Sequence, residues 1–128
     1  MAPELIAGEI EPEASVDIWS LGITMIQLLD KVPPYYDYLP VRLFCLLTDE
    51  NEAPPHCNNP QKYSPELNDF LRRCLQKDPK KRATTKELLQ HPWLNGITDE
   101  DLVLEVYIEK AQYRIENGIQ EEEEEDDE

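Results

Sequence analysis

The chain has 128 residues, 40% of them hydrophobic, which is enough for one domain with a modest core. Its 28 acidic residues outnumber its 12 basic residues, and the resulting net charge of −16 argues against nonspecific binding to nucleic acid or to an anionic membrane. The three cysteines form no Cys-x-x-Cys pair, so we expect reduced thiols, a cytoplasmic location and no metal site.

Most of the negative charge lies near the end of the chain. Residues 98–128 contain 14 acidic and two basic residues, whereas residues 1–97 contain 14 acidic and ten basic residues. We therefore divide the chain into a folded part at 1–97, a possible extra helix at 98–118 and a tail at 119–128. The like charges of the tail repel one another, which predicts disorder.

Residues 15–30 predict the central helix of the fold. The apolar residues between Val16 and Leu29 fall on every face of a helix, and a helix that is apolar all round is buried all round. Ser15 is placed to cap its first turn, and the prolines at 33 and 34 follow its end. The run is too short to span a bilayer. We expect a mainly α fold built around this helix.

Shorter helices follow along the chain. Pro40 begins a short apolar segment, and Ser64, Pro65 and Glu66 form a strong helix start. The helix after Ser64 has one apolar face at the spacing i, i+3, i+4, i+7, i+8, formed by Leu67, Phe70, Leu71, Cys74 and Leu75.

The last folded helix is predicted near residue 84. Thr84 and Glu87 have the spacing of a capping box, and Leu88 and Leu89 are expected to face inward. Further on, the apolar spacing from Leu104 to Ile115 favours a helix, although the alternation of residues 102–108 also permits a strand.

The sequence contains no assembled active site. It has four glycines and no glycine-rich phosphate loop, and it has no nucleophile motif. Its acidic pairs lie in loops and the tail, where we expect them to be solvated surface residues. We therefore expect no catalytic, cofactor-binding or metal-binding residue in this chain.

Four residues are candidates for structural roles, and two of them, Asp17 and Glu4, have alternative interpretations. Asp17 is either a solvated first-turn acid or a buried carboxylate that accepts backbone N–H groups from another segment. Trp19 fits an ordinary core position. Glu4 lies either on the surface or against a distant arginine, and Arg82 fits a solvated basic run.

Four segments follow one another over residues 1–94: "MAPE", "SVDIWSLGIT", "KVPPY" and "SPELNDFLRRCLQKDPKKRATTKELLQHPWL". Together they resemble the later half of the C-lobe of a eukaryotic serine/threonine protein kinase. "MAPE" is similar to the Ala-Pro-Glu motif that closes the activation segment, and "VDIWSLG" to the motif of the central helix. "WSLGIT", "PPY" and "LLQHPWL" are most similar to the sterile-twenty/germinal-centre branch of the family.

The resemblance implies structural roles for the four residues. Glu4 would form a buried ion pair with Arg82, which ties the end of the activation segment to the lobe. Asp17 would bind backbone N–H groups of the catalytic loop, and Trp19 would pack beneath the activation segment. Arg72 and Arg73, with the loop after residue 32, would be docking surface at most.

The departures from the family pattern concern catalysis. A kinase needs a glycine-rich loop, an ATP-anchoring lysine, His-Arg-Asp and Asp-Phe-Gly, all upstream of Ala-Pro-Glu, and this sequence contains none of them. We therefore expect either that Met1 is an internal residue of a longer kinase or that the chain descends from a truncated copy. In both cases ATP and Mg²⁺ would bind only in the full-length parent, and this chain would be inactive by itself. Apolar side chains near Trp19 and Ile23 would then meet water, which favours self-association.

Three functions remain open. The chain is the substrate-side part of a kinase that phosphorylates protein substrates, or a non-catalytic scaffold that binds partners through the exposed lobe face, or the carrier of an acidic tail that binds basic proteins. The same structural motifs would persist in an inactive pseudokinase.

Overall fold

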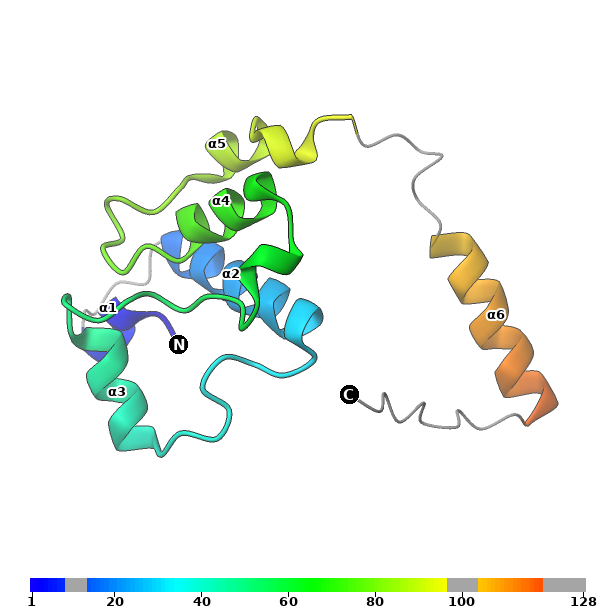
Figure 1. The fold of residues 1–128 in the computed structure, drawn as a ribbon, viewed down its shortest axis with the longest axis horizontal. Helices are drawn as coiled ribbons and strands as arrows, with labels where there is room; N and C mark the ends of the chain where they lie inside the picture. Colours follow the sequence, from blue (N-terminus) through cyan, green and yellow to red (C-terminus); the bar gives the residue numbers. More distant parts are fainter. Residues whose placement is uncertain (9–13, 97–103, 119–128) are drawn as a thin grey trace. The chain divides into compact units, whose positions relative to one another are not determined.

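The computed structural model describes residues 1–8, 14–96 and 104–118. They form a first compact unit, Met1–Asn95, and part of a second that begins at Gly96 (Figure 1). All the regular elements in these ranges are helical: α1 (Pro3–Ile6), α2 (Ser15–Asp30), α3 (Pro40–Thr48), a 3-10 turn η1 (Pro60–Lys62), α4 (Pro65–Cys74), α5 (Thr85–Leu89), a 3-10 turn η2 (Pro92–Leu94) and α6 (Leu104–Asn117). The predicted mainly α fold is confirmed.

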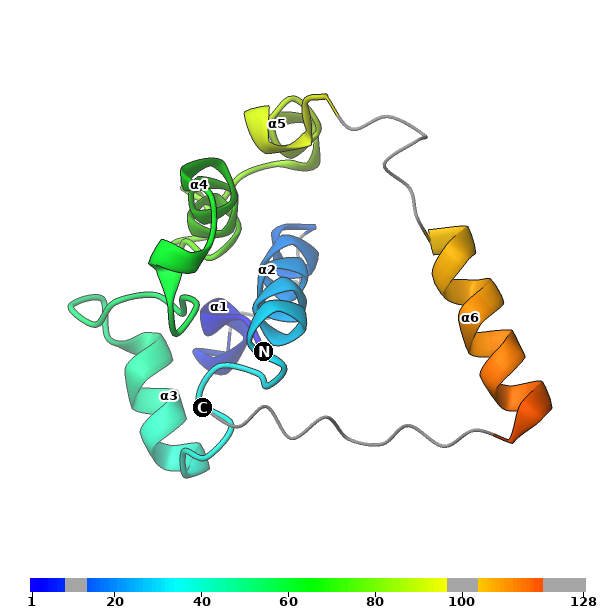
Figure 2. The same cartoon turned by 45° about the vertical axis from the view of Figure 1, so that its right-hand side comes forward.

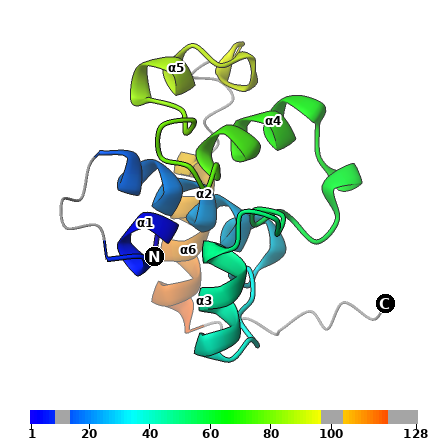
Figure 3. The same cartoon turned by 90° about the vertical axis from the view of Figure 1, so that its left-hand side faces the viewer.

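Helix α2 is the centre of the first unit. In Figure 2 the ribbons of α1, α3 and α4 lie on the same side of α2, and α4 packs directly against it, while α1 packs against α3. Figure 3 shows α4 and α5 above α2, and α1 and α3 below it. The expected cap is wrong: the helix begins at Ser15 without a side-chain cap, and Lys31 ends it in the left-handed conformation with φ 64°.

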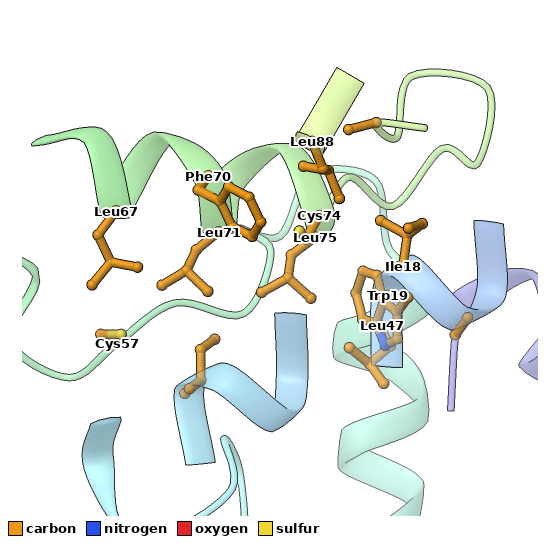
Figure 4. Close-up of a cluster of buried hydrophobic side chains, with 13 residues drawn as sticks. Ile18, Trp19, Leu47, Cys57, Leu67, Phe70, Leu71, Cys74, Leu75 and Leu88 are labelled. Carbon is orange, nitrogen blue, oxygen red and sulfur yellow. The ribbon is translucent and has the colours of Figure 1, made fainter. Parts of the chain in front are cut away.

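The core lies where α2 meets α4. Trp19 is 1% exposed, and Leu75, after the end of α4, is fully buried. Figure 4 shows Leu67, Leu71 and Leu75 pointing from the α4 segment towards α2. The predicted apolar face of α4 is therefore correct, and Ser64 caps this helix as expected by accepting a hydrogen bond from the N–H of Leu67 at 3.2 Å.

Helix α5 has the predicted capping box but buries only one of the two leucines assigned to the core. Both hydrogen bonds between Thr84 and Glu87 are present. Leu88 is 4% exposed, whereas Leu89 is 71% exposed, so the expected inward position of Leu89 is wrong. Consecutive residues of a helix point in directions about 100° apart, so a helix that touches the core on one side cannot bury both.

The second unit contains α6, where the structure forms a helix and not the alternative strand. Its described side chains are exposed. Residues 98–103 of the possible extra helix and the whole predicted tail, 119–128, lie outside the described residues.

Gly22 sets the distance between α2 and α4. A Cβ atom at this position would lie 2.7 Å from Cγ of Leu75 and 2.9 Å from Cβ of Cys74. Both neighbours are fully buried, so neither can move aside into solvent. The glycine is required here because the two helices approach too closely for a side chain.

We expect Gly22→Ala to destabilise the chain by about 1–2 kcal/mol, because the steric clash in a packed core outweighs the higher helix propensity of alanine. The midpoint of thermal unfolding, followed by circular dichroism, measures the change. Thr24→Ala, at an exposed position of the same helix, is the control and should alter the midpoint little. A midpoint that rises in Gly22→Ala would contradict the close packing.

Candidate functional site

The structure brings Glu4 and Arg82 together in a buried, two-pronged ion pair. Nη1 of Arg82 donates to Oε1 of Glu4 at 2.6 Å, and Nη2 donates to Oε2 at 3.0 Å. The two residues are 8% and 4% exposed, respectively. Such parallel hydrogen bonds fix the orientation of both groups as well as their distance.

The other N–H groups of Arg82 bind backbone carbonyls. Nε donates to the carbonyl of Gln76 at 2.9 Å, Nη1 to that of Ser15 at 2.9 Å, and Nη2 to that of Lys77 at 3.3 Å. All five donors of the guanidinium are therefore satisfied, which is the condition for burying its charge without a large desolvation penalty.

Three segments of the chain supply this junction. Glu4 lies in α1, which begins with a proline at its first position. Ser15 begins α2, and the remaining groups lie between the end of α4 and the start of α5. Trp19 lies beside the guanidinium group: its ring centroid is 5.2 Å from Cζ of Arg82, which is close enough for a cation–π contact.

The charge of the Glu4 carboxylate is maintained by its partner. Burial by itself would raise its pKa, but the hydrogen bonds and positive charge of Arg82, with a backbone hydrogen bond, lower the pKa below the usual value. The pair therefore stays ionised at neutral pH.

Asp17 lies apart from this junction. It is exposed in the first turn of α2, and the hydrogen bonds found among the described residues do not involve its carboxylate. Ser20, Leu21, Thr24 and Leu28 are also exposed, and their spacing puts them on the face of α2 that carries Asp17. We call these five residues the outer face of α2.

The uncovered apolar residues of α2 agree only in part with the expectation that they lie near Trp19 and Ile23. Trp19 is buried and Ile23 is half-buried, whereas Leu21 is 42% exposed and Leu28 is 76% exposed. The uncovered side of the helix is thus rotated away from Trp19, because the Arg82 junction and the core occupy the tryptophan side.

A second polar network joins α4 to η2. Asp69 accepts hydrogen bonds from Arg73 and from buried His91, each at 2.8 Å, and also pairs with Arg72. The hydrogen bond with His91, followed by those with Arg73 and Arg72, holds the pKa of Asp69 well below its usual range. The i, i+3 and i, i+4 spacings from Asp69 to the arginines were a usable sequence signal, whereas nothing in the sequence indicated His91 as a partner.

Lys77 is another residue whose role was not predicted. Its ammonium group donates to the carbonyls of Leu46, Asp49 and Glu52 at 2.6, 2.8 and 2.9 Å. Burial lowers the pKa of Lys77, although Asp49 and Glu52 oppose this shift. Lys77 thereby attaches the end of α3 and the turn after it to the segment that follows α4.

Within the described ranges, no group of three or more His, Cys, Asp or Glu side chains is placed to hold a metal ion. The described helices are also too short or too polar to cross a lipid bilayer.

Residues 1–94 match the model of the protein kinase domain. The chain belongs to the protein kinase family. It is 38% identical over 104 residues to serine/threonine-protein kinase 4 homolog A of Dictyostelium discoideum. The aligned region covers 81% of this chain and 22% of that protein. The chain is 46% identical over 103 residues to serine/threonine-protein kinase pakF of the same organism, covering 80% of this chain and 8% of the relative.

A third kinase relative matches almost the whole chain. Serine/threonine-protein kinase 10 of Xenopus tropicalis is 38% identical over 135 residues, covering 99% of this chain and 14% of that protein. The predicted kinase family, with its sterile-twenty/germinal-centre branch, is confirmed by such relatives. The chain spans less than a quarter of the length of each of these three kinases.

We expect Glu4→Gln to destabilise this kinase segment by about 3–5 kcal/mol, because the substitution leaves the buried charge of Arg82 without its counter-charge. Urea unfolding at pH 7 measures the loss. The double variant Glu4→Leu/Arg82→Met, which removes both charges, should recover much of the stability. Glu66→Gln, at an exposed position, is the control.

The same variant should change the pH dependence of stability. The pKa of Glu4 is lower in the folded chain, so its contribution is complete above the unfolded pKa of about 4.3 and is lost as the pH falls through the folded value. The wild-type chain should therefore lose more stability than Glu4→Gln between pH 5 and pH 3. Parallel pH profiles for the two proteins would show that Glu4 does not act in this way.

Proposed function

We propose that the chain is the substrate-side half of the large lobe of a serine/threonine protein kinase, whose complete form transfers the γ-phosphoryl group of ATP to a hydroxyl group of a protein substrate. The observation that carries the proposal is the outer face of α2, where a carboxylate and two leucines are exposed on the helix at the centre of the unit. A central helix with such a face is suited to packing against a further segment.

The residues that the structure describes do not fit ATP and Mg²⁺. The sequence has no glycine-rich phosphate loop, and its described carboxylates do not converge with other ligands on a metal position. In the proposed complete kinase, those groups bind to residues upstream of Ala-Pro-Glu. We assign no step of the transfer to this chain.

Under this proposal, the chain contributes support for the catalytic machinery. The Glu4–Arg82 pair fixes α1, and hence the end of the activation segment, against the lobe. Asp17 offers its carboxylate to backbone N–H groups of the catalytic loop, in agreement with its exposed position on α2. A cytoplasmic location agrees with the free thiols of Cys45, Cys57 and Cys74.

A chimeric kinase tests the proposal. Residues 1–94 would replace the matching segment of serine/threonine-protein kinase 10 of X. tropicalis, and phosphorylation of a protein substrate would be measured. We expect the chimera to be active. Asp17→Asn should lower its kcat by about tenfold to a hundredfold, because the catalytic loop loses a charged hydrogen-bond acceptor.

Glu66→Gln is the matched control in the chimera, because it removes one exposed carboxylate from another helix and should leave kcat unchanged. Circular dichroism establishes that each chimera is folded. A folded chimera without activity would overturn the proposed role of the segment, and an Asp17→Asn chimera of full activity would overturn the role of Asp17.

A second candidate function is a non-catalytic interaction module, which the exposed leucines of α2 favour. Leu28 is 76% exposed and Leu21 is 42% exposed on the same helix face. Apolar side chains grouped on one face are typical of a surface that binds a partner or a second copy.

Sedimentation velocity tests for self-association through this face. We expect the 128-residue chain to form dimers or larger species, and the variant Leu21→Glu/Leu28→Glu to shift it towards the monomer, because charges placed in an apolar contact repel. Leu89→Glu, at a leucine of α5 that is 71% exposed, should leave the distribution unchanged. A monomeric wild-type chain would exclude self-association at the concentrations tested.

A further inference from the structure

The loop between α2 and α3 borders a hollow with a volume of about 400 Å³. It lies where this loop meets residues 56 and 58, outside the outer face of α2 and the Arg82 junction. Its chemically distinctive lining consists of aromatic and hydrogen-bonding side chains: Asp30, Tyr35, Tyr36, Asp37, Tyr38 and His56.

The tyrosines present aromatic surface to the hollow. The ring centroids of Tyr35 and Tyr38 are 5.2 Å apart, with the planes tilted by 47°. Tyr36 is 68% exposed, so its ring is accessible to a ligand. The guanidinium carbon of Arg42 lies 4.3 Å from the centroid of Tyr38, so this ring already contacts a cation of the chain, and Tyr35 and Tyr36 are the rings left for a ligand.

Two carboxylates lie among the rings and act as hydrogen-bond acceptors. Asp30 accepts the backbone N–H of Asn58 at 3.0 Å through one of its two carboxylate oxygens. Asp37 is exposed. Nδ1 of His56 lies 3.1 Å from the carbonyl oxygen of Pro54, and because a carbonyl only accepts, Nδ1 donates this hydrogen bond.

We propose that this hollow binds a cationic side chain, arginine or lysine, presented by a basic polypeptide. Aromatic faces attract cations through their quadrupole, and carboxylates pair with guanidinium or ammonium groups. The carboxylates of this lining repel anions. An uncharged apolar ligand would offer these carboxylates no partner. Binding here needs neither ATP nor phosphoryl transfer, so the inference stands independently of the proposed kinase function.

An NMR titration of the full 128-residue chain tests the site, with acetyl-Gly-Arg-Arg-Gly-amide as the probe. We expect the largest amide shift changes at residues 35–38. The double variant Tyr36→Ala/Asp37→Asn should weaken binding by about fivefold to tenfold, because it removes one cation–π contact and one ion pair. Tyr36→Phe keeps the ring and should bind like the wild type.

Three controls separate this site from general attraction to an acidic chain. Glu50→Gln makes the same charge change as Asp37→Asn at an exposed position outside the hollow, and should change the affinity less than twofold. Removal of residues 119–128 should not alter the amide shift changes that the peptide causes at residues 35–38. The same peptide with citrulline in place of arginine, which is uncharged, should not bind.

The proposal is overturned if the citrulline peptide binds equally well, if the shifts occur only outside residues 35–38, or if Glu50→Gln weakens binding as much as the double variant does. Tyr36 and Asp37 are both exposed, so the double variant should fold, and circular dichroism checks this. If its helical signal is lost, the citrulline comparison and the shift map of the unaltered chain decide the question.

Discussion

The rest of the first unit depends on the hydrogen bonds and the ion pair of the Arg82 guanidinium group. This group is buried, and each of its five N–H groups has an acceptor. Two of those acceptors, Glu4 and the carbonyl of Ser15, are 78 and 67 residues away in the sequence. A helix as short as α1 has little stability of its own, so this ion pair, rather than helix propensity, holds the beginning of the chain against the unit.

Helix α2 combines a tightly packed side with an open one. On the packed side, Gly22 lets α4 approach so closely that no Cβ fits between the helices. On the open side, Asp17 and Leu28 are exposed. Close packing limits how far a helix can shift, so the packed side keeps the open side in a defined position. This contrast within one helix is the physical basis for treating the unit as part of a larger kinase lobe.

The two proposed binding surfaces differ in chemistry and are therefore separable. The outer face of α2 offers leucine side chains and one carboxylate, which suit a polypeptide segment that brings apolar residues and backbone donors. The hollow beside Tyr35 and Tyr38 offers aromatic rings and acceptors, which suit a cation. Because no residue belongs to both, a substitution in one should leave the other intact.

The sequence by itself determined helices α2 to α5, the caps at Ser64 and Thr84 and the kinase family, because periodicity, capping and motif order are properties of neighbouring residues. It left the environment of Glu4 open until the family resemblance suggested a partner, and it gave no sign of the pair between Asp69 and His91. It placed the uncovered apolar residues of α2 near Trp19 and Ile23, where Leu21 is exposed, but did not indicate Leu28. Only the tertiary structure decided these points, because which face of an all-apolar helix is covered, and which charges meet, depends on where distant segments pack.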